Sequence, residues 1–269
     1  MSAHALDLDA YFARIGYAGP RTAEYATLTA LHRAHVRAFP FEYFDIHLGR
    51  GIRIDLPSIE QKLVRDRRGG YCFEQNTLFA AVLRALGFTV APLIARVRWN
   101  LPVDLPTPLT HMLLRVEVPD AGPCLADVGF GSMSLVEPLR FVLDAAQPAG
   151  LEPRRIVARG TFFAQQARLG DTWNDVYLFS GDEAPAIDFE VGNWYTSTHP
   201  QSRFRQNLGA SLAGEACRHT LLNREFTTRH ADGRVEQRTL ATADELLALL
   251  AEVFGLRFPP GTRFGLHGC

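Results

Sequence analysis

The sequence predicts an α+β fold, and three observations support this prediction. Apolar residues recur at three- and four-residue steps through residues 1–87, which is the period of amphipathic helices. Strand-like runs separated by Pro and Gly begin at Thr89, and past Pro200 a hairpin signal is followed by one more helix. We therefore expect three units: a helical one at 1–87, a small sheet or barrel at 88–200, and a mixed one at 201–269.

Four helices are expected in the first unit, at residues 6–15, 22–38, 58–67 and from 72 onward. Pro40 stops the second helix, and Gly87 stands where the fourth would end. Ser58 with Gln61 fits a capping box at the start of the third.

Strands are expected in the second unit at residues 89–99, 111–118, 124–128, 154–158, 162–167 and 175–179. In the third unit, runs at 221–230 and 234–240 flank Asp232-Gly233, which is a strong hairpin signal. Residues 242–245, Thr-Ala-Asp-Glu, form a capping box that opens a leucine-rich helix, whose apolar residues make more than one stripe.

The composition is ordinary for a globular protein, 47% hydrophobic with a net charge of -1, which argues against a nucleic-acid partner. Lys62 is the only lysine and follows no glycine-rich loop, so lysine Schiff-base and phosphate-loop chemistry are not expected. The four cysteines form no C-x-x-C pair, so we expect free thiols and no metal site. There is no signal pattern and no apolar stretch of about 18 residues, so we expect a cytoplasmic protein with no membrane partner.

Residues 68–76, Arg-Gly-Gly-Tyr-Cys-Phe-Glu-Gln-Asn, place a lone cysteine at the start of a helix. The free N–H groups of the first turn, together with Arg67 and Arg68, favour the thiolate of Cys72, the nucleophilic form of sulfur. We expect Gly69-Gly70 to supply a turn at positive φ that aims this side chain. The alternative is that Cys72 is a small buried hydrophobe, as most free cysteines are.

An activated cysteine requires a base, and nine histidines compete for that role. We expect ordinary positions, terminal or solvated, for His4, His32, His35 and His219. His111 differs because it opens an alternating strand and shares one face of it with Leu113, Arg115 and Glu117.

Asp127 lies on the next strand with the parity that matches His111. If the hairpin loop is centred on Pro119, the two side chains lie directly opposite each other. A turn centred one residue later would separate them by a two-residue slip, unless twist or a bulge compensates. A carboxylate on one ring nitrogen leaves the other to take the thiol proton, so Cys72, His111 and Asp127 form a complete nucleophile, base and orienter set. The alternative is a strand-end histidine and a turn aspartate.

These residues resemble the arylamine N-acetyltransferase family. The resemblance covers about residues 10–255 and rests on five blocks in matching order, at residues 40–42, 68–76, 110–112, 127–131 and 192–200. It implies an N-terminal helical bundle, a central β-barrel and a C-terminal α/β lid, around a catalytic core like that of papain and the transglutaminases. It also implies ping-pong transfer of an acetyl group from acetyl-CoA, through Cys72, to a small aromatic amine, hydrazine or N-hydroxyarylamine. A monomer or a homodimer is expected.

The same resemblance assigns two sets of binding residues. Those implied for the acceptor cleft are Phe41, Tyr71, Val97, Phe130 and Phe204. Those implied beside CoA are Thr110, Gly129, Phe130 and Gly131, with Trp99 and His230 as weaker members. We expect backbone N–H groups of residues 129–132 to face the pyrophosphate. The chain departs from the family at Tyr43-Phe44, where Asn-Leu is usual, and residues 259–269 match nothing in it and are expected to form a flexible tail.

Three other functions remain open at this point. An amide synthase would use the same three residues to transfer a larger acyl group. A cysteine protease or transglutaminase would share them but would require an open peptide groove, whereas the long segment after Asp127 favours a closed cleft. A non-enzymatic module would bind CoA with an unreactive Cys72.

Overall fold

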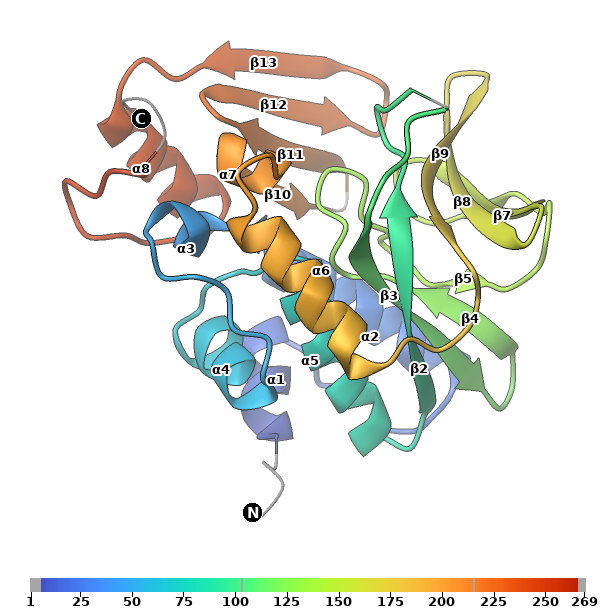
Figure 1. The fold of residues 1–269 in the computed structure, drawn as a ribbon. Helices are drawn as coiled ribbons and strands as arrows, with labels where there is room; N and C mark the ends of the chain where they lie inside the picture. Colours follow the sequence, from blue (N-terminus) through green and yellow to red (C-terminus); the bar gives the residue numbers. More distant parts are fainter. Residues whose placement is uncertain (1–5, 103, 215, 266–269) are drawn as a thin grey trace.

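The computed structural model describes residues 6–102, 104–214 and 216–265. Helices and two sheets form three regions (Figure 1): an eight-stranded sheet on the right, a five-stranded sheet with helix α8 at the upper left, and the N-terminal helices below. The expected α+β class is confirmed. The division at 1–87, 88–200 and 201–269 stays a prediction, because strand β1 (Phe41–Glu42) of the first segment pairs with β10 (Gly209–Ala213) of the third.

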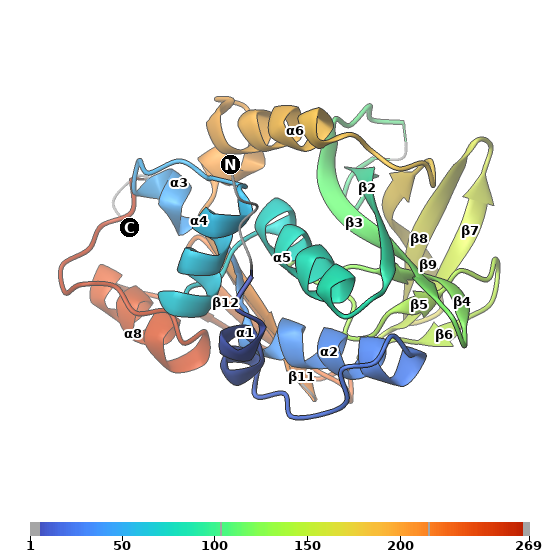
Figure 2. The ribbon, with the colours of Figure 1, turned by 90° about the horizontal axis from the view of Figure 1, so that it is seen from below.

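The N-terminal helices surround the one that carries the cysteine. They are α1 (Leu8–Ile15), α2 (Tyr25–Ala38), α3 (Phe44–His47), α4 (Leu56–Glu60), the π-helical turn η1 (Gln61–Arg65) and α5 (Cys72–Ala85). Figure 2 shows α5 in the middle of the molecule, between α2 on one side and α6 (Ala186–Thr198) on the other. Ten of its residues are buried, as expected of a helix that is enclosed on several sides.

One expectation for these helices was wrong, and one helix was not expected. The third helix begins at Leu56, because Asp55 rather than Ser58 is its cap and accepts a hydrogen bond from the Ser58 amide at 3.0 Å. It then widens into a π turn before Asp66. Helix α6 was not predicted, since Gly192 and the Thr/Ser-rich end give it low helix propensity.

The eight-stranded sheet forms a nearly closed barrel with the strand order β5-β4-β3-β2-β9-β8-β7-β6. Its strands are β2 (Thr89–Val97), β3 (Leu109–Val118), β4 (Gly122–Ala126), β5 (Leu139–Arg140), β6 (Gln147–Pro148), β7 (Pro153–Arg159), β8 (Phe162–Leu169) and β9 (Thr172–Phe179). The Gln147 side chain joins the two edge strands, since it accepts from the Arg140 amide at 2.8 Å and donates to the Arg140 carbonyl at 2.9 Å. Apolar side chains from several strands, such as Leu113, Ile156 and Phe179, fill the interior.

The second sheet has the order β1-β10-β11-β12-β13 and is covered by α8 (Ala243–Val253). The expected hairpin at Asp232-Gly233 joins β12 (Glu225–His230) to β13 (Val235–Thr239). The expected single run at 221–230 was wrong, because Asn223, at φ 54°, turns the chain between β11 (Cys217–Leu222) and β12.

The C-terminal segment packs more closely than expected. Phe264 is buried, and its ring centroid lies 4.9 Å from that of Phe44, so the expectation of a flexible tail was wrong up to residue 265. Residues 266–269, with Cys269, lie outside the described residues.

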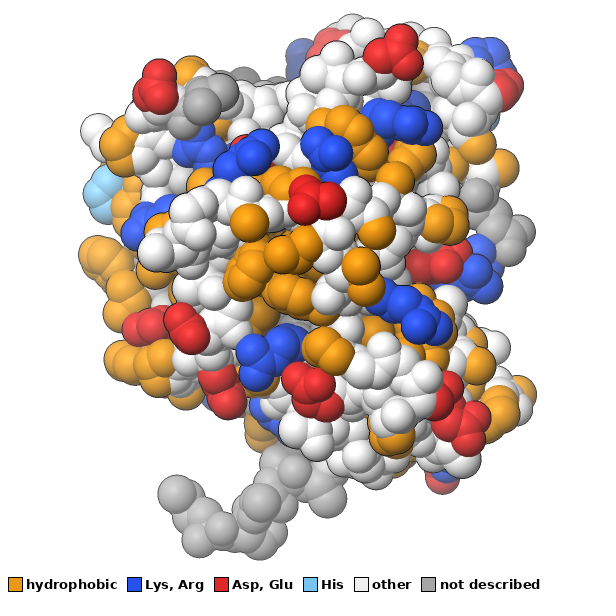
Figure 3. All heavy atoms as spheres, turned by 90° about the vertical axis from the view of Figure 1, so that its right-hand side faces the viewer, with side chains coloured by type: hydrophobic (Ala, Val, Ile, Leu, Met, Phe, Trp, Pro, Cys, Tyr) orange, Lys and Arg blue, Asp and Glu red, His pale blue; other side chains and the backbone are white. Residues whose placement is uncertain are grey.

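The face of the molecule seen in Figure 3 shows apolar side chains gathered near its centre, with charged side chains of both signs around them. Over the described part of the chain, no helix is long and apolar enough to cross a membrane.

Candidate active site

Cys72 is the first residue of α5 and is held against the end of a β-strand. It is 4% exposed, and its Sγ lies 3.6 Å from the carbonyl oxygen of Thr110, at the start of β3. As expected, the thiol stands at a helix N-terminus, where the first-turn N–H groups favour an anion. A buried, apolar cysteine would not require this placement.

The glycine pair before it serves a different purpose from the one expected. Neither Gly69 nor Gly70 has a positive φ, whereas Arg67 does, at 55°. A Cβ at Gly69 would lie 2.0 Å from the carbonyl oxygen of Pro40, and one at Gly70 would lie 2.9 Å from Oε2 of Glu74. The glycines are therefore required by close approach of two chain segments and of a side chain, rather than by a left-handed turn.

His111 and Asp127 are in contact, although the hairpin takes the less direct of the two expected forms. β3 and β4 pair with Val118 opposite Gly122, so the turn is centred on Asp120 and Asp127 follows the end of β4. Of the two alternatives, the structure therefore has the turn one residue later, with the two-residue slip. The chain beyond the strand nevertheless brings Asp127 Oδ2 within 2.8 Å of His111 Nε2, and both residues are buried.

The electrostatics of this pair favour an imidazolium beside the sulfur. Burial alone would lower the pKa of His111, but the Asp127 carboxylate and a hydrogen bond with Cys72 raise it to about 10. Burial likewise opposes ionisation of Asp127, yet His111 and the hydrogen bonds it accepts keep its pKa below the usual value. The protonated imidazole is therefore the favoured form of His111, with its positive charge beside the sulfur.

Further residues fix Asp127. Its Oδ1 accepts hydrogen bonds from Asn76 Nδ2 at 3.1 Å and from the Gly129 amide at 3.0 Å. Its own amide donates to His32 Nε2 at 3.2 Å, while His32 Nδ1 lies 3.1 Å from the carbonyl oxygen of Val136. Burial lowers the pKa of His32 to about 4, so this ring is neutral and carries its proton on Nδ1.

Two of these residues were not foreseen. His32 was expected to be solvated but is fully buried, as is His35, because α2 turns both towards the core beside Leu28 and Leu31. The three- and four-residue spacing of these four residues was the available signal. Asn76 belonged to the motif without an assigned role, and no sequence pattern indicates which carboxylate an amide will bind.

The residues implied for the acceptor gather in two places. Phe41 and Tyr71 lie around Phe204, with ring centroids 6.2 and 5.9 Å from it, and Tyr43 meets Phe204 edge-on at 4.5 Å. The unusual Tyr43 thus joins this aromatic cluster, whereas Phe44 packs in a separate core.

The second place is around the imidazole. Phe130 lies with its ring centroid 5.0 Å from that of His111. Val97 pairs across the sheet with Tyr177, whose ring is also 5.0 Å from His111.

The residues implied for CoA are more dispersed. Thr110, Gly129, Phe130 and Gly131 adjoin Cys72 or the Asp127 loop, and a Cβ at Gly129 would lie 2.8 Å from the Cα of Cys72. The amides of Gly129 and Gly131 donate to Asp127 and to Ser134 Oγ, and the expectation that backbone N–H groups of residues 129–132 face a pyrophosphate stays a prediction.

The two weaker assignments for CoA lie elsewhere. Trp99 packs on the barrel core. His230 lies on β12 of the other sheet, 3.4 Å from Glu236.

Within the described residues, no group of three or more His, Cys, Asp or Glu side chains is placed to hold a metal ion. The cysteines described, 72, 124 and 217, are all free thiols.

Comparison with known proteins gives consistent matches along most of the chain. A family model described as N-acetyltransferase matches residues 24–261. The arylamine N-acetyltransferase of Mycobacterium tuberculosis is 42% identical over 255 residues, which are 94% of this chain and 90% of that protein. A Salmonella typhimurium protein named arylamine N-acetyltransferase / N-hydroxyarylamine O-acetyltransferase is 38% identical over 93% of this chain and 88% of its own length.

The fold agrees with solved structures as well. The structure of Mycobacterium marinum arylamine N-acetyltransferase in complex with CoA superposes with a TM-score of 0.89 at 38% identity, over 93% of this chain and 92% of that one.

Proposed function

This chain belongs to the arylamine N-acetyltransferase family, and from that premise we propose that it transfers an acetyl group from acetyl-CoA to arylamines through a thioester on Cys72. The observation that carries the proposal is the buried His111–Asp127 pair, with Cys72 at the start of α5 held 3.6 Å from the carbonyl oxygen of Thr110, the residue before His111. The names of its relatives support arylamines and N-hydroxyarylamines as acceptors and CoA as the carrier.

In the first half-reaction, the Cys72 thiolate attacks the carbonyl carbon of acetyl-CoA. The bond from that carbon to the CoA sulfur breaks, and the imidazolium of His111 protonates the departing CoA thiolate. The exchange of one thioester for another is nearly balanced in energy, because both leaving groups are thiolates. The products are free CoA and acetyl-Cys72.

In the second half-reaction, the nitrogen of a neutral arylamine attacks acetyl-Cys72. His111 accepts the amine proton while the Cys72 thiolate leaves, which restores the imidazolium and thiolate. Asp127 holds the ring through Nε2 in both steps, so Nδ1 is the nitrogen that serves the sulfur. The aromatic cluster of Phe41, Tyr71 and Phe204 offers flat apolar walls to the ring of the amine.

Steady-state kinetics test this function. With acetyl-CoA and 4-aminobenzoate or aniline as varied substrates, a ping-pong enzyme gives parallel double-reciprocal lines. Converging lines would contradict the Cys72 thioester. An amide synthase with a larger acyl group is the second candidate, and longer acyl-CoA thioesters as donors distinguish the two. Higher kcat/KM with a long chain than with acetyl would favour the synthase.

Four finer assignments rest on the sequence and stay proposals. The division into a helical bundle, barrel and lid follows the three hydrophobic clusters only in part. The second assignment is that the protein is a monomer or a homodimer. The third is that arylhydrazines are further acceptors. A cytoplasmic location is consistent with three free thiols in the described residues.

A further inference from the structure

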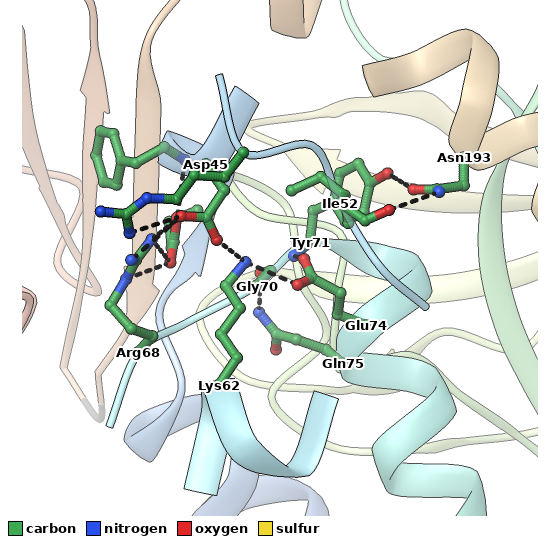
Figure 4. A network of polar contacts seen from close by, with 12 residues as sticks. Asp45, Ile52, Lys62, Arg68, Gly70, Tyr71, Glu74, Gln75 and Asn193 are labelled. Atoms are coloured by element: carbon green, nitrogen blue, oxygen red, sulfur yellow. Dashed lines mark hydrogen bonds and ion pairs between the residues drawn. The ribbon is translucent and has the colours of Figure 1, made fainter. Parts of the chain in front are cut away.

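A network of buried charges lies beside the first turn of α5 (Figure 4). It contains three carboxylates and two cations, contributed by β1, α3, η1, the loop before α5, and α5 itself: Glu42, Asp45, Lys62, Arg68 and Glu74. The catalytic steps proposed above use none of them. The desolvation of so many buried charges opposes folding unless each charge has a partner, and a buried ion-pair network is therefore weak evidence of a role in stability alone.

Lys62 is the centre of this network and the only lysine of the chain. Its Nζ lies 2.7 Å from Oε1 of Glu74 and 2.8 Å from Oδ2 of Asp45. Its side chain is 15% exposed and that of Glu74 is 1% exposed, so solvent screens this pair little.

Glu74 connects the lysine to the nucleophile. Its second oxygen, Oε2, accepts a hydrogen bond from the Tyr71 amide at 3.0 Å, which caps the N-terminus of α5 one residue before Cys72. Gln75 secures the same segment by donating to the Gly70 carbonyl at 2.6 Å and to the Pro40 carbonyl at 3.2 Å. The backbone that carries the thiol is therefore held by a carboxylate whose other oxygen is held by Lys62.

Holding both contacts at once depends on the charge of Glu74, because only the carboxylate accepts at both of its oxygens, from Lys62 and from the Tyr71 amide. Burial raises the pKa of Glu74 to about 7, and the Lys62 ammonium opposes this rise, whereas Glu42 adds to it. The surrounding carboxylates raise the pKa of Lys62 despite its burial, so the lysine remains protonated. Without the ammonium, the carboxyl would protonate at higher pH and lose one of its acceptor positions.

We propose that Lys62 is a positioning residue for the nucleophile: by holding the Glu74 carboxylate on the Tyr71 amide, it fixes the first turn of α5 and the direction of the Cys72 thiol. The inference rests on the proposed function, in which Cys72 is acetylated. By this inference, the first half-reaction also depends on Lys62, which lies in η1, outside the motif at residues 68–76.

Single-turnover acetylation of Cys72, followed by quenching and mass spectrometry, tests this role. Lys62→Met should slow acetylation at least about tenfold, which is the effect of about 1.4 kcal/mol on a barrier. Lys62→Arg should retain most of the wild-type rate, because a cavity of about 220 Å³ lined in part by Lys62, Asp45 and Arg68 leaves room for a guanidinium. KM for the amine should change less than the acetylation rate does, since the ion-pair partners of Lys62, Asp45 and Glu74, are not members of the aromatic cluster.

A double substitution separates positioning from general stability. In Lys62→Met/Glu74→Gln, the amide oxygen can still accept from Tyr71 and carries no charge that requires a cation. This variant should acetylate Cys72 faster than Lys62→Met does. Because loss of the ammonium moves the pKa of Glu74 further above about 7, the deficit of Lys62→Met should be larger just above pH 7, where only the wild-type carboxyl is ionised, than at about pH 6, where both are mostly protonated. The double variant should lose this dependence. The groups facing Glu74 are Lys62, Glu42 and the Tyr71 amide.

Two outcomes would overturn the inference: equal acetylation rates for Lys62→Met and the wild type, or no gain in the double variant. If Lys62→Met does not fold, the acetylation rates of Glu74→Gln, which keeps an oxygen for the Tyr71 amide, and Glu74→Ala, which does not, are compared instead. Similar rates for these two variants would overturn the inference. Failure of the proposed function is a separate result, because it would leave even the wild-type Cys72 without acetyl.

Discussion

The Nε2 atom of His111 lies 2.8 Å from Oδ2 of Asp127, and the two side chains are only 3% and 0% exposed. A carboxylate buried to this extent is stable as an anion only if it is fully partnered, and Asn76 and Gly129 occupy its other oxygen. The pair therefore holds the imidazole of His111 in a fixed orientation within a buried site at the N-terminus of α5.

Asp127→Asn should preserve the fold and remove most of the activity. The amide would no longer stabilise the imidazolium and could bind the wrong ring tautomer, so we expect kcat/KM to fall about 10³-fold or more. The measurement is acetyl transfer to aniline. Asp120→Asn, in the exposed turn of the same hairpin, is the matched control and should leave the rate unchanged. Similar rates for the two variants would remove Asp127 from the mechanism.

NMR titration of 15N-histidine should distinguish His111 from His32. His111 should remain protonated at neutral pH and titrate near pH 10, whereas His32 should be neutral above about pH 4. Because the folded-state pKa of His111 lies above its unfolded value, its protonation stabilises the fold fully below about pH 6.5. This contribution is lost as the pH rises through 10. A midpoint for His111 near 6.5 would contradict the ion pair.

The sequence predicted most elements of this fold because their signals are local. Strand-like runs between Pro and Gly clusters identified six barrel strands, and Asp232-Gly233 identified a hairpin. Local patterns could not show that Asn223 would turn the chain. Nor could they show why α6 contains Gly192: a Cβ at this position would lie 2.8 Å from the ring of Phe73, so only glycine leaves room for that ring. Such close approaches arise from tertiary packing, which overrides helix and strand propensity.

The candidate site divides in the same way. The triad could be named from the motif and from strand parity. The contacts that support it could not, because Asn76 and His32 reach Asp127 from two different helices, α5 and α2. The reason for the glycine pair was also misjudged, since the carbonyl of Pro40, about thirty residues earlier, is what excludes a side chain at Gly69.

Gly129→Ala should impair the site more than the fold elsewhere. The added Cβ would lie 2.8 Å from the Cα of Cys72 and 3.0 Å from Nδ2 of Asn76, so the nucleophile or the Asp127 loop must shift. We expect about a hundredfold loss of kcat/KM, since small misplacements at a reacting centre are costly. Gly160→Ala is the comparison. It is strained by its φ of 61° but meets open space, so it should cost about 1 kcal/mol of stability and no activity.

Glu152→Ala should strongly destabilise the protein. Glu152 Oε2 lies 3.1 Å from a guanidinium nitrogen of both Arg154 and Arg218, and all three residues are buried. Removing the carboxylate leaves two buried cations uncompensated, which costs about 3–5 kcal/mol. Urea denaturation measures this. Asp9→Ala breaks the exposed pair with Arg21 and should cost under about 1 kcal/mol. Equal effects of the two substitutions would contradict this account of the buried cluster.

Peptide mass spectrometry after incubation with acetyl-CoA tests the central claim most directly. Trypsin releases residues 69–84, whose single cysteine is Cys72. We predict one acetyl group on that peptide, its loss when an arylamine is added before quenching, and none in Cys72→Ser. An unlabelled peptide, or equal labelling of the wild type and Cys72→Ser, would contradict acetyl transfer through Cys72.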